Sequence, residues 1–404
     1  MRPARSFGIS LLAAACLLPL EWLNAATPVM VKRLPGGGIK PSVAIDSAGA
    51  LRVVYFTGKP EGGNAWYTTS SDGGATFAPP IQVNSQSGSV IGVSSIRGPQ
   101  LALGKAKAVH ILWNGASGAK PAAPLNPAMP ADSKFNGIPL LYSRLDETGK
   151  RFEPQRNLMT KTCALDGGSA IVADDADNVF AVWHALEPGG KGEEARSVWM
   201  ALSKDGGRTF APENSILNGA DGVCGCCSLS AHIGVNGSLA ILFRSATEGG
   251  SERPMNLLLS RDRGASFSRQ TLDAWPMKTC PMSAETIAPV GRRFAFAWEG
   301  KDGIQLSWAN LDAPAASNPA SPSSITEKNS AGTNKLPSIA INKSGEILLA
   351  WTEGMGWNKR GALVWELFDA EGKQSVAKGR QDGVPANGTV AAAALPDGHF
   401  VILY

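Results

Sequence analysis

The sequence predicts an all-β fold, a single β-propeller of six or seven four-stranded blades with short Asp-containing turns. Three observations carry this prediction. A strand–turn–strand pattern recurs along the chain, one turn motif appears three times, and 46 Gly and 27 Pro residues in 404 are typical of a turn-rich chain. A chain of this length exceeds the usual size of one hydrophobic core unless that core is built from repeats.

The recurring unit is a short apolar strand, a turn with Gly or Asp, and a second apolar strand that usually ends in an aromatic residue. Its seven copies begin at Lys40, Arg97, Asp166, Cys227, Ser283, Leu336 and Val390. The spacing of these copies is near that of four-stranded propeller blades. The segment "PVMVKRL" near residue 30 could pair with the seventh copy and close the ring, so six and seven blades both remain open.

A turn motif lies between several of these hairpins. It reads "SSDGGATF" at 70–77, "SKDGGRTF" at 203–210 and "SRDRGASF" at 260–267. In each copy an Asp side chain can accept backbone N–H groups, a Gly supplies backbone freedom, and the final Phe anchors the turn in the core. The three aspartates are Asp72, Asp205 and Asp262.

These turns resemble the Asp-boxes (BNR repeats) of the sialidase, or neuraminidase, superfamily, and the resemblance extends over residues 27–404. It implies a propeller in which the boxes join the third and fourth strands of blades, on the face opposite the active site. Asp72, Asp205 and Asp262 are therefore expected to be structural. Sialidases have six blades, whereas this sequence shows seven hairpins and is richer in cysteine.

The first 26 residues read as an export signal. Arg2 and Arg5 give a positive start, Phe7–Leu20 is almost wholly apolar, and small residues follow. The chain is therefore expected in the periplasm or outside the cell. A minor alternative is a lipoprotein anchored through Cys16, because "LAAAC" resembles a lipobox.

The apolar run of the signal is too short to span a membrane comfortably, so no transmembrane anchor is expected. The formal net charge is +4, with no basic stripe interleaved with aromatic residues. Nucleic acid is therefore not an expected partner.

One face of the predicted propeller gathers the residues that could carry chemistry. Propeller strands alternate in direction, so the start of each innermost strand and the end of each second strand lie on the same face, the usual ligand side. Start positions contribute Arg97, Cys163, Asp166, Cys224, Cys226, Cys227, Cys280 and Met282. End positions contribute Asn114, His184, Arg244, Glu299 and Glu353. The Ala/Pro-rich stretch 116–137 is expected to form part of a pocket wall on this face.

The cysteines of this face have three explanations. Disulfides could link adjacent blades in an exported protein, for example Cys163 or Cys224 to a neighbour and Cys227 to Cys280. A vicinal Cys226–Cys227 disulfide would be strained and redox-active. Alternatively, thiolates, a thioether and an imidazole such as that of His184 are the donor types that copper or zinc selects. The ligands of that metal site would be Cys224, Cys226, Cys227, Cys280 and Met282.

The resemblance to sialidases also implies a set of substrate contacts. Three arginines would bind the substrate carboxylate, because paired guanidinium groups fix a planar anion. "KRLPGGG" resembles the Arg-Ile-Pro motif of the family, which makes Arg33 the first candidate. Further substrate-binding candidates by position are Arg97, Arg244, Asn114 and His184.

Catalytic candidates are the carboxylates Asp166, Glu299 and Glu353, as acid/base groups. The family's Tyr nucleophile with its Glu is not identifiable, because none of the four tyrosines lies in a recognisable late-chain motif. The leading hypothesis is therefore an exported sialidase-like propeller that binds or hydrolyses glycans, as an exo-α-sialidase-type glycoside hydrolase that needs no cofactor. The alternative is a non-hydrolytic propeller with a soft-metal or redox site, or a disulfide-linked binding scaffold. The expected partner is a glycan or another small polar ligand.

Overall fold

A computed structural model describes Met1 and residues 27–130, 132–133, 135–217, 221–234, 236–290, 293–310, 323–324, 334–356 and 358–404. The predicted export signal, including Cys16, lies outside the described residues apart from Met1. Within the described ranges, no helix is both long and apolar enough to cross a membrane.

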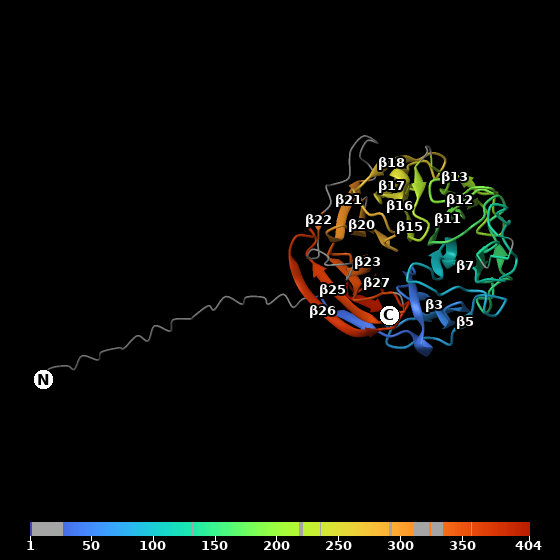
Figure 1. The fold of residues 1–404 in the computed structure, drawn as a ribbon. Coiled ribbons are helices and arrows are strands. Elements are labelled where there is room, and N and C mark those ends of the chain that lie inside the picture. Colours follow the sequence, from blue (N-terminus) through green and yellow to red (C-terminus); the bar gives the residue numbers. More distant parts are fainter. Residues whose placement is uncertain are drawn as a thin grey trace.

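Seven β-sheets form a ring around a central channel (Figure 1). The fold is an all-β propeller of seven blades, which confirms the predicted class and settles the blade number. The only helices in the described part of the chain are three short 3₁₀ turns. They are η1 (Pro35–Gly37), η2 (Lys105–Lys107) and η3 (Glu248–Gly250).

Each blade is built outward from the channel by antiparallel strands, apart from the outermost strand of the seventh blade, which is parallel to its neighbour. The innermost strands are β2 (Ile39–Ile45), β6 (Gln100–Leu103), β10 (Ser169–Ala173), β15 (Leu229–Ile233), β19 (Glu285–Val290), β23 (Asn334–Ile341) and β27 (Ala391–Ala394). The second strands are β3 (Leu51–Lys59), β7 (Val109–Asn114), β11 (Val179–Ala185), β16 (Leu239–Ala246), β20 (Arg293–Gly300), β24 (Ile347–Glu353) and β28 (Phe400–Leu403). The third strands are β4 (Gly62–Ser70), β8 (Leu140–Arg144), β12 (Ser197–Ser203), β17 (Met255–Ser260), β21 (Gly303–Asn310) and β25 (Gly361–Phe368). The outermost strands are β5 (Ile81–Gln82), β9 (Arg156–Asn157), β13 (Asn214–Ser215), β18 (Ser268–Thr271), β22 (Ser323–Ser324) and β26 (Ser375–Val384).

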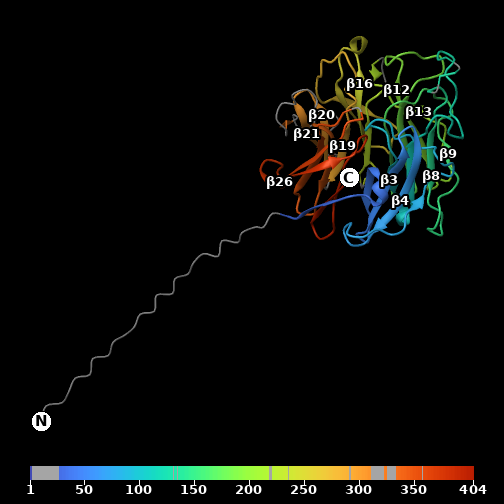
Figure 2. The ribbon, with the colours of Figure 1, turned by 60° about the horizontal axis from the view of Figure 1, so that its bottom comes forward.

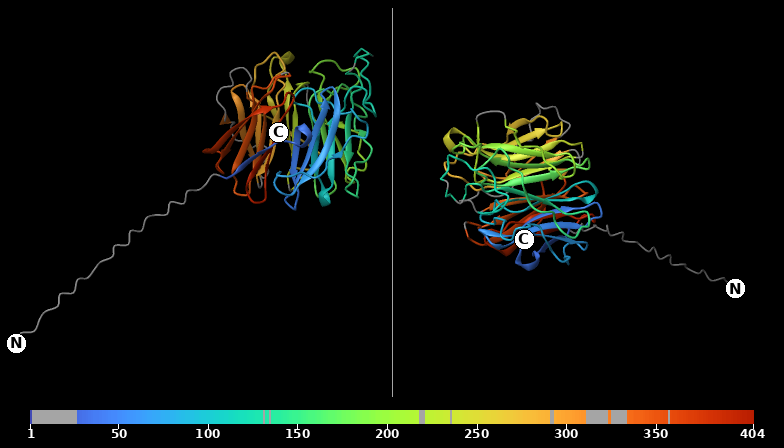
Figure 3. Two further views of the ribbon diagram at one scale, coloured as in Figure 1. Left: turned by 90° about the horizontal axis from the view of Figure 1, so that it is seen from below. Right: turned by 90° about the vertical axis from the view of Figure 1, so that its right-hand side faces the viewer.

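The two faces of the ring follow from the strand pairing. Ser169, at the start of β10, pairs with Trp183 near the end of β11, and the other blades repeat this arrangement. The face that holds these ends is called the top face here, and the opposite one the bottom face. Figures 2 and 3 show the blades from the side, with their strands running between the two faces.

The ring closes through a strand near the N-terminal end of the described chain. β1 (Val29–Lys32) pairs in parallel with β28, with Val29 beside Phe400 and Lys32 beside Leu403. The seventh blade thus has three strands, in the order β1-β28-β27. The prediction that the segment near residue 30 closes the ring is confirmed.

The core lies between the blades. Strand β11 is buried along its whole length because its alternating side chains face two different neighbours. Val179 and Trp183 pack with the second blade, whereas Phe180 and Val182 pack with the fourth. Burying each of these side chains contributes about 1.5–3 kcal/mol, so stability comes from blade-to-blade packing.

The Asp-box turns lie on the bottom face, where they join third and fourth strands in three blades. In the first turn, Asp72 accepts hydrogen bonds from Ser70 Oγ at 2.7 Å, Thr76 N at 2.9 Å and Thr76 Oγ1 at 2.5 Å. Gly74, at φ +86°, donates its N–H to Ser70 Oγ at 2.8 Å. Asp205 and Asp262 make the same contacts in their own turns. The predicted structural role of the boxes follows from these contacts.

Candidate functional site

The upper half of the central channel is a cavity of about 300 Å³, lined by the starts of all seven innermost strands. It holds charged groups that are out of contact with bulk water. Lys40 is buried and donates from Nζ to the Ser94 carbonyl, and burial, with the nearby Arg97 charge, holds its pKa well below the ordinary value. Both carboxylate oxygens of Glu285 are buried with no partner among the described residues, and burial raises the pKa of Glu285.

The lower half of the channel differs in character. It is a second cavity of about 480 Å³, and His232 is its one polar side chain among the described lining residues. The charged side chains Lys40, Arg97 and Glu285 in the described lining of the channel therefore lie at its top end.

A larger pocket opens on the top face, beside the channel. Its volume is about 720 Å³, within the range of small-ligand sites. Its apolar lining includes Ile91, Val93, Met129, Phe135, Leu165 and Leu186, and its polar lining includes Glu61, Arg97, Asn126, Asp166, Lys191 and Arg196. We call it the top-face pocket. Met129 and Phe135 come from the 116–137 stretch, so the prediction that this stretch forms a pocket wall is confirmed.

Arg97 and Asp166 meet at the polar side of the top-face pocket. Their side chains form an ion pair, and Arg97 Nε also donates to the Asp166 carbonyl at 2.5 Å. The Asp166 side chain is 43% exposed, so its carboxylate can also accept hydrogen bonds from a ligand. Both residues were predicted for this face, and the structure brings them together.

Arg196 is the second cation of this wall. It is 8% exposed, and its Nη1 donates to the Ala164 carbonyl at 2.9 Å, whereas its Nε has no partner in the described structure. No described carboxylate lies within ion-pair distance, and burial lowers the pKa of Arg196 despite the charges of Asp166 and Glu193. The pocket therefore contains a buried cation whose charge the protein does not pair directly.

Asn114 and His184 lie beneath this wall and bind protein backbone. Asn114 Nδ2 donates to the Gly167 carbonyl at 2.6 Å. His184 is fully buried, its Nε2 lies 3.1 Å from the Cys227 carbonyl oxygen, and burial lowers its pKa to about 3. A Cβ on Gly167 would lie 2.5 Å from His184 Nε2, so only glycine permits this close contact.

Arg244 is fully buried and its contacts are with protein. Its Nε donates to Ser283 Oγ at 2.7 Å, its Nη2 to the Glu299 carbonyl at 2.5 Å, and its Nη1 to the Arg253 carbonyl. Its guanidinium stacks 4.6 Å above the Trp275 ring. These contacts join the fourth and fifth blades.

The Glu299 carboxylate is also occupied by the protein. It accepts the N–H of Ala284 at 3.1 Å and of Leu336 at 2.9 Å, and it pairs with Lys335 Nζ at 3.4 Å. It is 2% exposed, and it connects the fifth and sixth blades.

Arg33 and Glu353 lie on the outside of the described pockets. Arg33 is exposed and stacks 4.6 Å above the Tyr404 ring, whereas Glu353 pairs with Arg380. The three predicted arginines thus do not converge on one ligand position, and neither do the three predicted carboxylates. Of these six residues, Arg97 and Asp166 line the top-face pocket.

Three buried charged residues of the top end, Arg196, Lys40 and Glu285, were not predicted as site residues. Arg196 precedes β12, a third strand, and third strands begin on the top face because neighbouring strands are antiparallel. Extending the direction rule to third strands would have found it. Lys40 and Glu285 stand at the starts of innermost strands, so the same rule already placed them on the top face.

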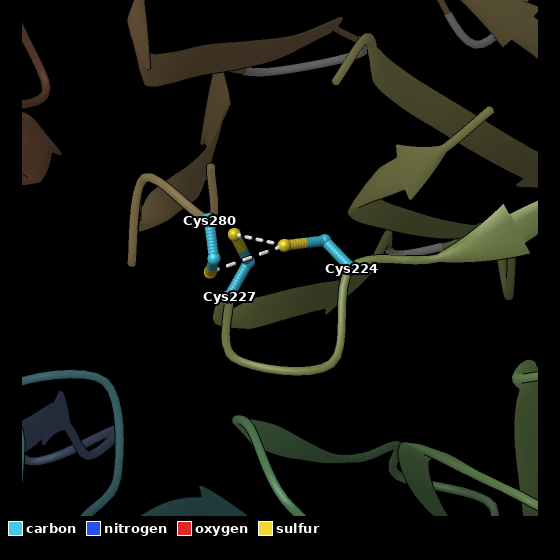
Figure 4. A group of neighbouring side chains, drawn as sticks. All are labelled: Cys224, Cys227 and Cys280. Atoms are coloured by element: carbon cyan, nitrogen blue, oxygen red, sulfur yellow. Dashed lines mark hydrogen bonds between the residues drawn. The ribbon is translucent and has the colours of Figure 1, made fainter. Parts of the chain in front are cut away.

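The four-cysteine cluster consists of Cys224, Cys226, Cys227 and Cys280. A disulfide joins Cys226 to Cys280, while Cys224 and Cys227 are buried thiols. The predicted pairing of Cys227 with Cys280 is wrong, and so is the vicinal Cys226–Cys227 bond, because the turn directs Cys226 towards the Cys280 loop and Cys227 inward. Figure 4 shows Cys224 and Cys227 on one loop, with Cys280 on another beside them.

The sulfur atoms of the cluster are close together. Cys224 Sγ lies 2.9 Å from Cys227 Sγ and 3.4 Å from Cys280 Sγ. Burial alone would raise the pKa of the Cys227 thiol. The hydrogen bond from Cys224 and the nearby Arg244 charge, with the Ser283 hydroxyl, lower that pKa to about 7. The same thiol hydrogen bond and burial raise the pKa of Cys224.

The remaining sulfur residues lie at the edge of the cluster or outside it. Met282 donates its N–H to Cys280 Sγ at 3.4 Å. Cys163 is a separate buried thiol that contacts the Leu186 carbonyl at 3.5 Å, and burial raises its pKa. Cys163 thus forms no disulfide with another cysteine of the described residues. The sulfurs of Cys224, Cys227 and Cys280 lie within 4.8 Å of one another, so this group could hold a metal ion.

The cysteine loop is attached to the wall of the top-face pocket. Gly225 N donates to Glu193 Oε1 at 2.8 Å, and Glu193 Oε2 pairs with Arg253 Nη1 at 2.6 Å. A Cβ on Gly225 would lie 3.3 Å from Arg196 Nε. The cluster and the buried cation of the pocket are therefore direct neighbours.

The chain is similar over most of its length to solved structures with the same fold. A protein of unknown function from Dyadobacter fermentans has a TM-score of 0.53 at 14% identity, covering 85% of this chain and 98% of its own. An α-L-arabinanase from Penicillium chrysogenum, solved with arabinobiose, has a TM-score of 0.52 at 12% identity, covering 83% and 94%. The Hadza microbial sialidase Hz136 has a TM-score of 0.51 at 12% identity, covering 85% and 68%.

No protein-family model and no curated protein matches the sequence. At these low identities the structural matches show the fold alone. The chain therefore shares the β-propeller fold of sialidase and α-L-arabinanase structures.

Proposed function

We propose that this protein is an exported propeller that binds a short acidic glycan in the top-face pocket. The observation that carries the proposal is Arg196, a buried cation without an ion pair in the wall of a 720 Å³ pocket. A ligand carboxylate would supply the missing negative charge, and a guanidinium group binds carboxylates through charge-assisted hydrogen bonds.

The rest of the pocket suits a sugar. Met129 and Phe135 offer apolar surface for the faces of sugar rings, while the partly exposed Asp166 carboxylate can accept hydrogen bonds from hydroxyl groups. Arg97 holds Asp166 in place through the ion pair. Two proteins with the same fold, a sialidase and an arabinanase solved with arabinobiose, provide precedent for glycan ligands.

Hydrolysis of a sialoside is the enzymatic form of this proposal, with Asp166 as its acid/base group. Glycosidases generally need two carboxylates at the scissile bond. The carboxylates in the described lining of the pocket are Glu61 and Asp166, whereas Glu299 and Glu353 are engaged elsewhere. Binding is therefore the proposed function, and turnover is a second readout of the same experiment.

The test is calorimetric titration with 3′-sialyllactose, trigalacturonate and, as a neutral control, arabinobiose, followed by chromatography for released sugar. Binding of an acidic ligand that weakens about 10- to 100-fold in Arg196→Gln supports the proposal. Ala128→Trp, which fills the pocket from its loop, should also prevent binding, while Arg33→Gln should leave it unchanged. No binding of either acidic ligand, or equal binding by Ala128→Trp, overturns the proposal.

A second candidate is a soft-metal site for copper or zinc at the four-cysteine cluster, favoured by the three neighbouring sulfurs. A closed zinc site takes four ligands, and soft thiolates select copper(I) or zinc. Because Cys280 is in a disulfide with Cys226, a full set of thiolates requires reduction of that bond. Metal analysis after reduction and dialysis against zinc or copper(I) should give one ion per chain, and none in Cys224→Ser/Cys227→Ser.

A further inference from the structure

The four-cysteine cluster contains more sulfur than a cross-link requires. The Cys226–Cys280 disulfide alone joins the loop before β15 to the loop before β19. Cys226 and Cys280 are partly exposed, whereas Cys224 and Cys227 are buried behind them. The cluster is therefore an outer disulfide in contact with an inner dithiol.

The geometry favours reaction between the two pairs. Cys224 Sγ lies 3.4 Å from Cys280 Sγ, the distance from which a nucleophile attacks (Figure 4). On its other side it lies 2.9 Å from Cys227 Sγ. Cys224 thus lies between the disulfide that it would attack and the Cys227 sulfur, which would then attack Cys224 and displace Cys280.

We propose that the cluster is an internal thiol–disulfide exchange centre, which moves the disulfide from Cys226–Cys280 to Cys224–Cys227. In the first step the Cys224 thiol passes its proton to the Cys227 thiolate and attacks Cys280 Sγ. The Cys224–Cys280 bond forms, the Cys226–Cys280 bond breaks, and Cys226 leaves as a thiolate.

In the second step the Cys227 thiol gives up that proton, the partly exposed Cys226 thiolate takes one up from solvent, and Cys227 attacks Cys224 Sγ. The Cys224–Cys227 bond forms, the Cys224–Cys280 bond breaks, and Cys280 leaves as a thiolate. One disulfide, one proton and one negative charge are conserved, so no oxidant or reductant is needed. The exchange converts an outer disulfide and a buried dithiol into a buried disulfide and an outer dithiol.

The surroundings of the cluster support the second step, in which Cys227 is the nucleophile. Ser283 Oγ donates to Cys227 Sγ at 3.5 Å, and the fully buried Arg244 guanidinium is held by Ser283. A hydroxyl donor and a fixed cation stabilise negative charge on sulfur. The product presents Cys226 and Cys280 as an accessible dithiol at the top face, the form that a thiol-reactive electrophile or a disulfide substrate would meet.

The experiment starts from the full chain equilibrated in a thiol–disulfide buffer that leaves one disulfide per molecule, verified by intact mass. The native protein is then treated with N-ethylmaleimide, and labels and disulfides are mapped by peptide mass spectrometry. We expect labels to accumulate on Cys226 and Cys280 while the Cys224–Cys227 disulfide appears, because alkylation traps the outer dithiol.

Variants separate the two steps. Cys224→Ser removes the attacking sulfur, so Cys226–Cys280 should persist without label. Cys227→Ser should stop after the first step, with a Cys224–Cys280 disulfide and a label on Cys226. Cys163→Ser lies outside the cluster and should behave as the wild type.

Three results would overturn the proposal. The wild type could keep Cys226–Cys280 throughout the labelling. Labels could also appear on Cys226 and Cys280 as fast in Cys224→Ser as in the wild type, which would mean that Cys224 takes no part. Finally, wild-type protein equilibrated in thiol–disulfide buffers could contain molecules with two disulfides and molecules with none, but never molecules with one. Both pairs would then be static cross-links.

Discussion

The bottom and top faces of the ring use polar groups in opposite ways. On the bottom face, Asp72, Asp205 and Asp262 bind side chains and N–H groups within four residues of their own position. On the top face, Arg97 binds Asp166, which is 69 residues away, and Cys226 is bonded to Cys280 across 54 residues. The aspartates of the bottom turns find their hydrogen-bond partners within the same turn, whereas these top-face groups find their partners on neighbouring blades.

This difference shows where function can arise in a repeated fold. A turn that satisfies its own polar groups is independent of its surroundings, so it can be repeated with little change. On the top face Arg196 and Glu285 are buried with unpaired atoms, at a cost in stability. Unpaired buried groups of this kind are typical of ligand sites.

Removing the shared partner of the cysteine cluster should have the largest effect. Cys280→Ser opens a 54-residue loop and should lower the free energy of unfolding by about 3–4 kcal/mol. Cys226→Ser should cost less than half as much, because Cys224, 3.4 Å from Cys280, can take its place. Urea unfolding of the oxidised proteins measures both values. Equal losses would show that Cys224 does not reach Cys280.

Loss of the buried Arg244 guanidinium should have the next largest effect on stability. Arg244→Met leaves the carbonyls of Arg253 and Glu299 without their buried donor and should destabilise the protein by about 3 kcal/mol. Arg33→Met, at an exposed position, should change stability by less than about 0.5 kcal/mol. The comparison is made by thermal unfolding. Similar effects at the two sites would contradict the structural role assigned to Arg244.

Acid should weaken the protein partly through Glu213. Burial alone would raise the pKa of Glu213, but hydrogen bonds from Thr160, Lys161 and Thr162 lower that pKa below its ordinary value overall. A lowered folded-state pKa gives stability that is present above the unfolded pKa and lost as the pH falls through the folded pKa. Glu213→Gln should therefore cost about 2 kcal/mol at neutral pH and progressively less on acidification. A difference that stays constant with pH would contradict this assignment.

The smallest effect is expected on the bottom face. Asp205→Asn weakens the contacts with Ser203 and Thr209 at a partly exposed turn and should cost about 1 kcal/mol. Glycan binding, measured by calorimetry, should be unchanged. A loss of binding in this variant would show that the two faces are coupled.

The sequence allowed the repeated part of the structure to be predicted well. Alternating apolar strands and Asp turns are local patterns, so the class of fold could be predicted from them. The resemblance to sialidases implied the place of the boxes, and the strand near residue 30 was one of two ways to complete the ring. Strand direction also placed Arg97 and Asp166 on the top face correctly. The strand and turn patterns behind the fold prediction are formed by residues close together in the sequence.

The chemistry of the top face was harder to predict because its partners are distant in sequence. Nothing near Arg244 indicates that Ser283 and the Glu299 carbonyl occupy its guanidinium. The choice between Cys226 and Cys227 as partner of Cys280 depends on the geometry of a turn. The pattern of residue types predicts neither the contacts of Arg244 nor the partner of Cys280.

The central claim is that the top-face pocket, not the bottom face, binds an acidic glycan. Hydrogen–deuterium exchange with mass spectrometry, with and without the acidic oligosaccharide that binds in calorimetry, tests it most directly. We predict slower exchange in residues 91–97, 116–138 and 186–196, and unchanged exchange in the three Asp-box turns. Protection centred on the Asp-box turns, or no protection at the pocket under saturating ligand, would contradict the account.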